Sequence, residues 1–191
     1  LHIAIFDTVM NHFHEVASTF AANPVTARFT LFGFSSDGLE DWFNIWPCFV
    51  VTTWHDGWSM TRTFFTAKPT ARQLEVYETV RRANEAAEAI VRPGVSFAEI
   101  DLTARRLIED AGFGRYFTHR LGHQIGLQDH EPGDVSAAHD EPVQAGQCFS
   151  IEPGIYIEGE IGVRIEDLLI VTEDGCELLN HYEKAPTVLE T

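Results

Sequence analysis

Residues 118–132 read THRLGHQIGLQDHEP and hold three of the nine histidines, His119, His123 and His130. A single histidine is more often a surface residue or a satisfied core residue than a ligand. Three histidines on one glycine-containing segment favour a shared site, because glycine allows the backbone to bring the imidazole rings close to a common centre. This stretch therefore predicts a chemical site.

Two further segments supply carboxylates: residues 150–156 read SIEPGIY, and residues 162–167 read GVRIED. Glu152 lies in an apolar context, where an unpaired carboxylate would be costly. Arg164 and Glu166 are two residues apart, so we expect them on one face of a single strand. A solvated outer face is the alternative, but the apolar residues around Glu166 favour a buried carboxylate that needs a cation.

Imidazole combined with carboxylates is the ligand set of a Zn, Mn, Co or Fe site rather than of a soft thiolate site. The residues alone predict a divalent-metal site built from His123, Glu152 and Glu166. The three cysteines are widely spaced and form neither a disulfide framework nor a CxxC pair, which is typical of a reducing, cytoplasmic environment.

The composition is that of one soluble globular domain: 191 residues, 45% hydrophobic and 22% charged. The net charge of −16 makes nucleic acid an improbable partner, because an acidic surface repels phosphates. No apolar run approaches the roughly 20 residues of a membrane span. Residues 1–20 lack the pattern of a signal peptide and are expected to form an amphipathic helix.

The hydrophobic periodicity predicts a long helix over residues 66–91, which Pro93-Gly94 ends. Ser96 and Glu99 predict a capping box at the start of a second helix. From Gly146 onward apolar and polar residues alternate as in strands, and residues 173–175 predict a turn. Two helices followed by strands indicate an α+β domain.

Taken together, these motifs resemble those of the Xaa-Pro dipeptidase and aminopeptidase P family, the M24 metallopeptidases. Residues 119–132 resemble the family pattern HRxGHGIGxxxHExP, with Gln124 in place of a glycine, and the two glutamate segments resemble its second and third motifs. The spacings also agree: seven residues from His123 to His130, twenty-nine to Glu152, and fourteen from there to Glu166. The similarity runs from about Thr61, in the sequence TRTF, to the C-terminus.

The resemblance implies a pita-bread fold, with a curved antiparallel sheet flanked by helices, over a single domain of residues 1–191 without the family's N-terminal domain. It implies His123, Glu152 and Glu166 as metal ligands and His119, His130 and Arg164 as catalytic residues. The family holds two divalent ions (Mn, Co or Zn) and hydrolyses proline-containing peptides. A homodimer is expected by analogy only.

The sequence departs from the family at two aspartates that complete the metal site. Counting back from TRTF without gaps places Ser59 and Cys48 at these positions, whereas matching Asp56-Gly57-Trp58 to the family's DGY places Val50 at the first and deletes the second. Neither alignment supplies an aspartate, so the ligand set is incomplete and two ions or fewer are expected.

Three explanations of the atypical residues 26–59 stay open: a reading-frame or sequencing error, a true divergence, or repositioned ligands among Asp37, Asp41 and Asp56. They correspond to different functions. The first prediction is an impaired Xaa-Pro peptidase, and the alternative is a non-catalytic domain that binds a peptide or partner. A metal-free hydrolase of the creatinase type, with His130 as a main catalytic group, ranks last because the three ligand residues are retained.

Overall fold

The structure is a computed structural model that describes residues 48–55, 58–65, 67–128 and 130–188, with side chains from residue 59 onward. The amphipathic helix expected over residues 1–20 lies outside the described residues, as do Asp37, Asp41 and Asp56. No helix in the described part of the chain is long and apolar enough to cross a bilayer.

Two helices pack side by side: α3 (Ala71–Ile90) and α4 (Phe97–Asp110). The first helix begins later than residue 66, because the hydroxyl of Thr70 accepts a hydrogen bond from the N–H of Gln73 and caps the helix there. The Gln73 side chain accepts from the N–H of Thr70 in return, so this end carries the reciprocal capping box. At α4, Ser96 accepts from the N–H of Glu99, which is the N-cap half of the predicted capping box.

The strands form mostly antiparallel pairs. They are β1 (Cys48–His55), β2 (Trp58–Phe65), β3 (Gly122–His123), β4 (Asp134–Val135), β5 (Cys148–Ile151), β6 (Gly154–Ile157), β7 (Ile161–Arg164), β8 (Asp167–Val171), β9 (Cys176–Leu178) and β10 (Thr187–Val188), with the 3₁₀ turn η1 (Gly114–Tyr116) after α4. The strand orders are β1-β2-β10, β3-β4, β5-β8-β9 and β6-β7. Only β10 pairs in parallel, with β2, among the described strands.

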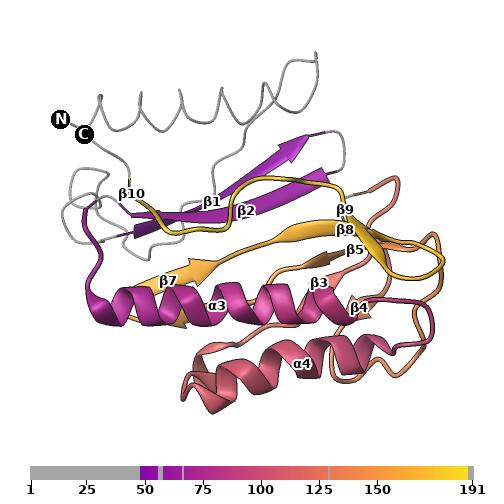
Figure 1. The fold of residues 1–191 in the computed structure, drawn as a ribbon, viewed down its shortest axis with the longest axis horizontal. Helices are drawn as coiled ribbons and strands as arrows, with labels where there is room; N and C mark the ends of the chain where they lie inside the picture. The colour runs from indigo at the N-terminus through magenta and orange to yellow at the C-terminus, as the bar shows by residue number, and fades with distance from the viewer. Residues whose placement is uncertain (1–47, 56–57, 66, 129, 189–191) are drawn as a thin grey trace.

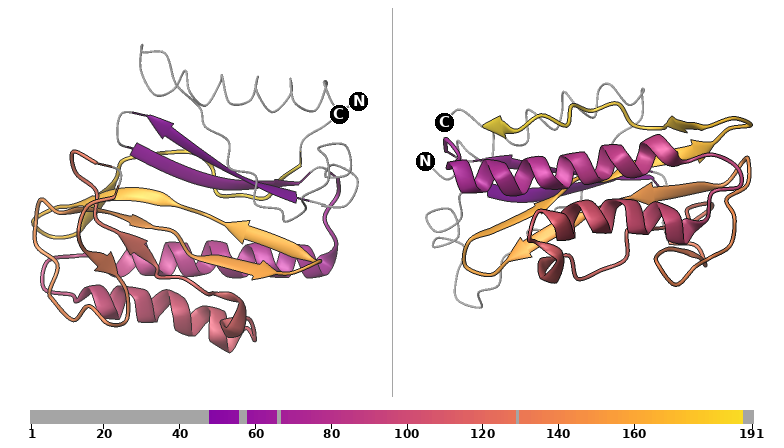
Figure 2. Two further views of the ribbon diagram at one scale, coloured as in Figure 1. Left: turned by 180° about the vertical axis from the view of Figure 1, so that it is seen from behind. Right: turned by 60° about the horizontal axis from the view of Figure 1, so that its bottom comes forward.

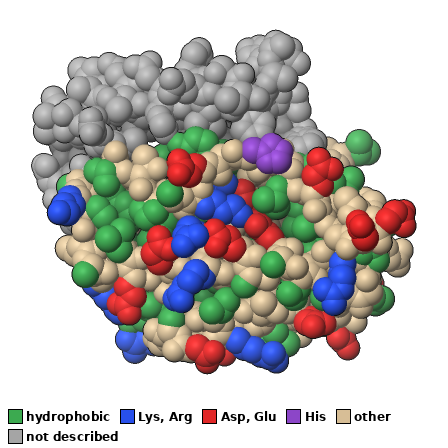
Figure 3. Space-filling view, viewed as in Figure 1, with side chains coloured by type: hydrophobic (Ala, Val, Ile, Leu, Met, Phe, Trp, Pro, Cys, Tyr) green, Lys and Arg blue, Asp and Glu red, His purple; other side chains and the backbone are tan. Residues whose placement is uncertain are grey.

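Both helices cover one side of the strand layer, as Figures 1 and 2 show. The core between the layers is apolar; its fully buried members include Tyr77, Phe97, Ile100, Ile108, Phe149, Ile151 and Ile165. On the opposite, solvent-facing side of α3, Arg81 pairs with Glu78 and Glu85, and Figure 3 shows acidic and basic side chains interspersed over the face it draws. The two helices and the mostly antiparallel strands confirm the α+β prediction for the fold.

The prediction that Arg164 and Glu166 share one strand is wrong. Arg164 is the last residue of β7, Asp167 is the first of β8, and Glu166 lies between them. Glu166 instead forms a bridge to Thr61 of β2, with its N–H donating to the Thr61 carbonyl at 3.0 Å. The chain changes partner strands at this point, from β6 to β5, and the Glu166 side chain is buried there.

Candidate metal centre

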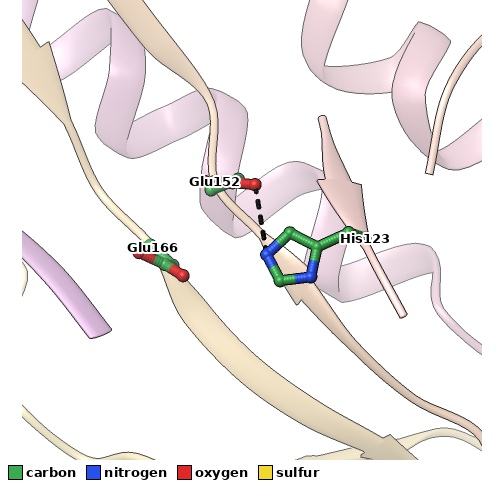
Figure 4. A group of neighbouring side chains, drawn as sticks. All are labelled: His123, Glu152 and Glu166. Atoms are coloured by element: carbon green, nitrogen blue, oxygen red, sulfur yellow. Dashed lines mark ion pairs between the residues drawn. The ribbon is translucent and has the colours of Figure 1, made fainter. Parts of the chain in front are cut away.

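Three side chains from distant parts of the sequence converge in the interior: His123 of β3, Glu152 just after β5, and Glu166 just before β8 (Figure 4). One ligand atom from each lies within 4.8 Å of the other two. The Nε2 atom of His123 is 3.7 Å from Oε1 of Glu152. The structure thus brings together the three residues that the sequence predicts as ligands.

The backbone around His123 fixes the direction of its ring. A side chain on Gly122 would bring its Cβ 1.9 Å from the carbonyl oxygen of Ser150, so only glycine allows this close approach. The N–H of His123 donates to the Ser150 hydroxyl at 3.0 Å. Its ring Nδ1 lies 3.2 Å from the Gln124 carbonyl, to which it can only donate, which leaves the Nε2 lone pair for a ligand.

Burial lowers the pKa of His123, so the neutral imidazole is favoured. Neutral imidazole is the form that coordinates a metal ion. The tautomer and the protonation state of His123 are therefore both those of a ligand.

Glu166 is held by two hydroxyl groups from β2. Ser59 donates to Oε1 at 2.5 Å, and Thr61 donates to Oε2. Ser59 and Glu166 are 4% and 2% exposed, so this contact is sheltered from water. Ser59 is the residue that the family resemblance places at an aspartate position, and in this chain its hydroxyl supports a carboxylate instead of adding one.

Arg164 lies between the two carboxylates. Its guanidinium is 3.8 Å from Oε2 of Glu152 and 3.9 Å from Oε2 of Glu166, and it donates to the Thr61 hydroxyl at 3.2 Å. Two carboxylates sharing one guanidinium leave an excess of negative charge in a buried place, which is costly without a cation. The donor set and its charge therefore fit a divalent metal ion.

His119 lies beside the three converging side chains, between two aromatic rings. Its ring contacts Phe117 and Tyr156, with centroids 5.1 and 5.6 Å away, and Tyr156 is hydrogen-bonded to Arg164. Burial lowers the pKa of His119, and its Nδ1 lies 2.7 Å from the Arg120 carbonyl. Its buried Nε2 has no hydrogen-bond partner among the described residues, so a neutral His119 presents an unused acceptor.

His130 lies against His123 on the solvent side. Its ring stacks on that of His123 with centroids 4.1 Å apart, and it is exposed to solvent. The expectation that all three histidines face one centre is met by this pair, whereas His119 reaches the group through Tyr156 and Arg164.

The hairpin register argues against the ungapped alignment, which places the two aspartate positions at Cys48 and Ser59. Ser59 is paired with Trp54, whereas Cys48 is paired with Phe65. Cys48 is thus six residues along β1 from the partner of Ser59, about 20 Å at 3.3 Å per residue. Cys48 therefore cannot share one metal site with Ser59.

Sequence reasoning missed a buried ion cluster behind the site. Arg62 donates to the Glu166 carbonyl at 2.8 Å and to Oδ1 of Asp167 at 2.6 Å. Lys184 lies 2.9 Å from Oδ2 of Asp167 and 2.6 Å from Oε2 of Glu88. The only sequence signals were the TRTF segment and the aspartate after Glu166, and neither indicates these partners.

This cluster predicts an unusual dependence of stability on pH. Burial raises the pKa of Glu88 from 4.5 to about 7, the charge of Asp167 adds to the rise, and Lys184 opposes it. A carboxyl group with a raised folded-state pKa contributes stability that is complete below about pH 4 and is lost as the pH rises through 7. The free energy of unfolding should therefore fall by about 1–3 kcal/mol between pH 5 and pH 8 on account of Glu88.

Urea unfolding of Glu88→Gln across this pH range measures the effect, because glutamine does not titrate. The exposed Glu85 on the same helix supplies the control Glu85→Gln. Glu88→Gln should flatten the decline and Glu85→Gln should keep it; equal slopes in both variants would contradict the assignment to Glu88.

Comparisons with known proteins agree with this geometry. The sequence pattern of metallopeptidase family M24 matches residues 54–173. An uncharacterised peptidase of Staphylococcus saprophyticus is 47% identical over 125 residues, which cover 65% of this chain and 36% of that protein.

Two solved structures have the same fold as this chain, which confirms the predicted pita-bread fold. Dipeptidase PepE from Mycobacterium ulcerans is 39% identical, with a TM-score of 0.70 over 74% of this chain and 39% of that one. An Xaa-Pro dipeptidase from Bacillus anthracis is 33% identical, with a TM-score of 0.71 over 74% of this chain and 41% of that one.

The fold and the buried His–Glu–Glu group define a chain of the metallopeptidase class. This chain belongs to metallopeptidase family M24, whose members depend on divalent metal ions. It spans about two fifths of the length of the relatives it matches.

Proposed function

We propose that this chain is the metal-binding part of an Xaa-Pro peptidase whose activity is impaired because one metal ligand set is incomplete. The observation that carries the proposal is the convergence of His123, Glu152 and Glu166 within 4.8 Å beside a shared arginine. These three residues would hold one divalent ion, with Mn, Co and Zn all compatible with one imidazole and two carboxylates.

The bound ion would supply Lewis acidity and a water of lowered pKa for amide hydrolysis. The chain's own residues would bind and orient the peptide. The unused Nε2 acceptor of His119 would accept a hydrogen bond from the substrate, and exposed His130 would meet the peptide at the entrance. Arg164 would keep the two carboxylates in place between these histidines.

A second candidate function is a non-catalytic domain that binds proline-containing peptides without cleaving them. The observation that favours it is Ser59, whose hydroxyl occupies the side of Glu166 where the resemblance implies a carboxylate. Three ligand residues bind one ion, but the family chemistry uses two. The proposal of a cytoplasmic location rests on the widely spaced cysteines, and that of a homodimer rests on the resemblance alone.

Proline release from a dipeptide such as Met-Pro tests the peptidase proposal. The purified chain with Mn²⁺ should release proline slowly, and a chelator should stop the release. The elemental content after desalting should be close to one ion per chain. Peptide binding by calorimetry without any proline release would favour the non-catalytic function, and an absence of both metal and peptide binding would reject both.

A further inference from the structure

At both proposed carboxylate ligands, Glu152 and Glu166, a backbone carbonyl of the ligand or of its neighbour accepts a hydrogen bond from a buried polar side chain. On the Glu152 side, the amide of Asn84 in α3 donates to the carbonyl of Ile151 at 3.0 Å. On the Glu166 side, Asp167 accepts from Arg62, which also donates to the Glu166 carbonyl. Asn84 and Asp167 are both fully buried.

One side chain contacts both of these supports. The ammonium group of Lys184 donates to Oδ1 of Asn84 at 2.7 Å and lies 2.9 Å from Oδ2 of Asp167. Its third partner is Glu88, at 2.6 Å. The three N–H donors of the ammonium group go to Asn84 and to both carboxylate oxygens of Glu88, and its contact with Asp167 is an ion pair. Lys184 belongs to the segment between β9 and β10, far from the site motifs in the sequence.

We propose that Lys184 is a positioning residue of the metal centre, acting on Glu152 through Asn84 and on Glu166 through Asp167. The inference rests on the proposed metal site and adds a determinant that lies outside its three motifs. Without the ammonium group, Asp167 would lose one of its two cationic partners and Asn84 would lose the partner that orients its amide. Glu152 and Glu166 would still be present as ligands, but the distance between their carboxylates would no longer be fixed.

The test is Co²⁺ binding by the full chain at one pH, with Lys184→Met as the variant. Residues that hold metal ligands from outside typically change metal affinity by about 10–100-fold, and we expect the Kd for Co²⁺ to rise about 10-fold. The visible absorption of bound Co²⁺ should also change, because it reports ligand geometry and does not follow from lowered stability alone. Lys68→Met is the matched control, since Lys68 is exposed and is the only other lysine in the chain.

Two further variants separate positioning from stability. Glu88→Gln changes a partner of Lys184 that is not linked to Glu152 or Glu166. It should leave the Kd for Co²⁺ within about twofold of the wild-type value. Asn84→Ser breaks the bond to Ile151 and removes one partner of Lys184, but it leaves the ion pairs of Lys184 with Asp167 and Glu88, so it should weaken Co²⁺ binding even where Lys184→Met fails to fold. A wild-type Kd and spectrum in a folded Lys184→Met would overturn the positioning role while the metal site stands, and a wild-type Kd in Asn84→Ser would overturn its action through Asn84. No Co²⁺ binding by the wild type would overturn the proposed site and this inference together.

Discussion

Replacing His123 with alanine is expected to abolish specific metal binding by the chain. His123 is 3% exposed, and its Nε2 is the only nitrogen ligand atom in the buried group. Its removal leaves two carboxylates and no neutral donor between them, so the Kd for Mn²⁺ should rise by more than the roughly 100-fold that outer partners of a metal site can cost. Any metal-dependent release of proline should disappear with it.

The neighbouring His130 supplies the control for this prediction. It stacks on His123 at 4.1 Å but is exposed and does not belong to the converging group. His130→Ala should keep the Mn²⁺ Kd within about threefold, because it loses a ring contact and no ligand. Calorimetric titration of both variants with Mn²⁺ measures the difference. Equal loss in the two variants would show that the stacked pair, and not His123 alone, forms the site.

The ligand group could be predicted from the sequence because its chemistry and spacing are both local signals. His123 directly follows a glycine, and each glutamate lies in an apolar segment that would not tolerate an unpaired charge. The close approach of Gly122 to Ser150 then follows from the absence of a side chain. The helices could also be predicted from the sequence, although α3 begins after its cap at Thr70 and not at residue 66.

The parts that could not be predicted depend on tertiary packing between distant segments. Nothing in the local sequence of Lys184 indicates that it meets Asn84 one hundred residues earlier. The change of partner strands at Glu166 depends on β2, which no alternation pattern near Glu166 reveals. The hairpin register that separates Cys48 from Ser59 was likewise inaccessible to an alignment that counts residues without geometry.

The substitution Ser59→Asp is expected to lower the Tm of the metal-free chain and to raise its affinity for Mn²⁺. The Ser59 hydroxyl is 2.5 Å from Oε1 of Glu166, so a carboxylate at position 59 would face Glu166 directly in a place that is almost free of solvent. Without a cation, the two like charges should cost about 2–3 kcal/mol. This corresponds to a fall in Tm of roughly 4–12 °C for a chain of this size.

With Mn²⁺ present, the same carboxylate becomes an additional oxygen ligand, and the sign of the effect reverses. The Mn²⁺ Kd should fall by at least about tenfold, and saturating Mn²⁺ should raise the Tm of Ser59→Asp by more than that of the wild type, because a ligand that binds only the folded state stabilises it by mass action. Ser59→Asn is the matched control, since it has the same shape without the charge. Thermal unfolding of the wild type and the two variants, with and without Mn²⁺, measures these changes in Tm. A metal-dependent gain of the same size in Ser59→Asn would mean that position 59 does not face the ion, and the incomplete ligand set would then have to be explained by residues outside β2.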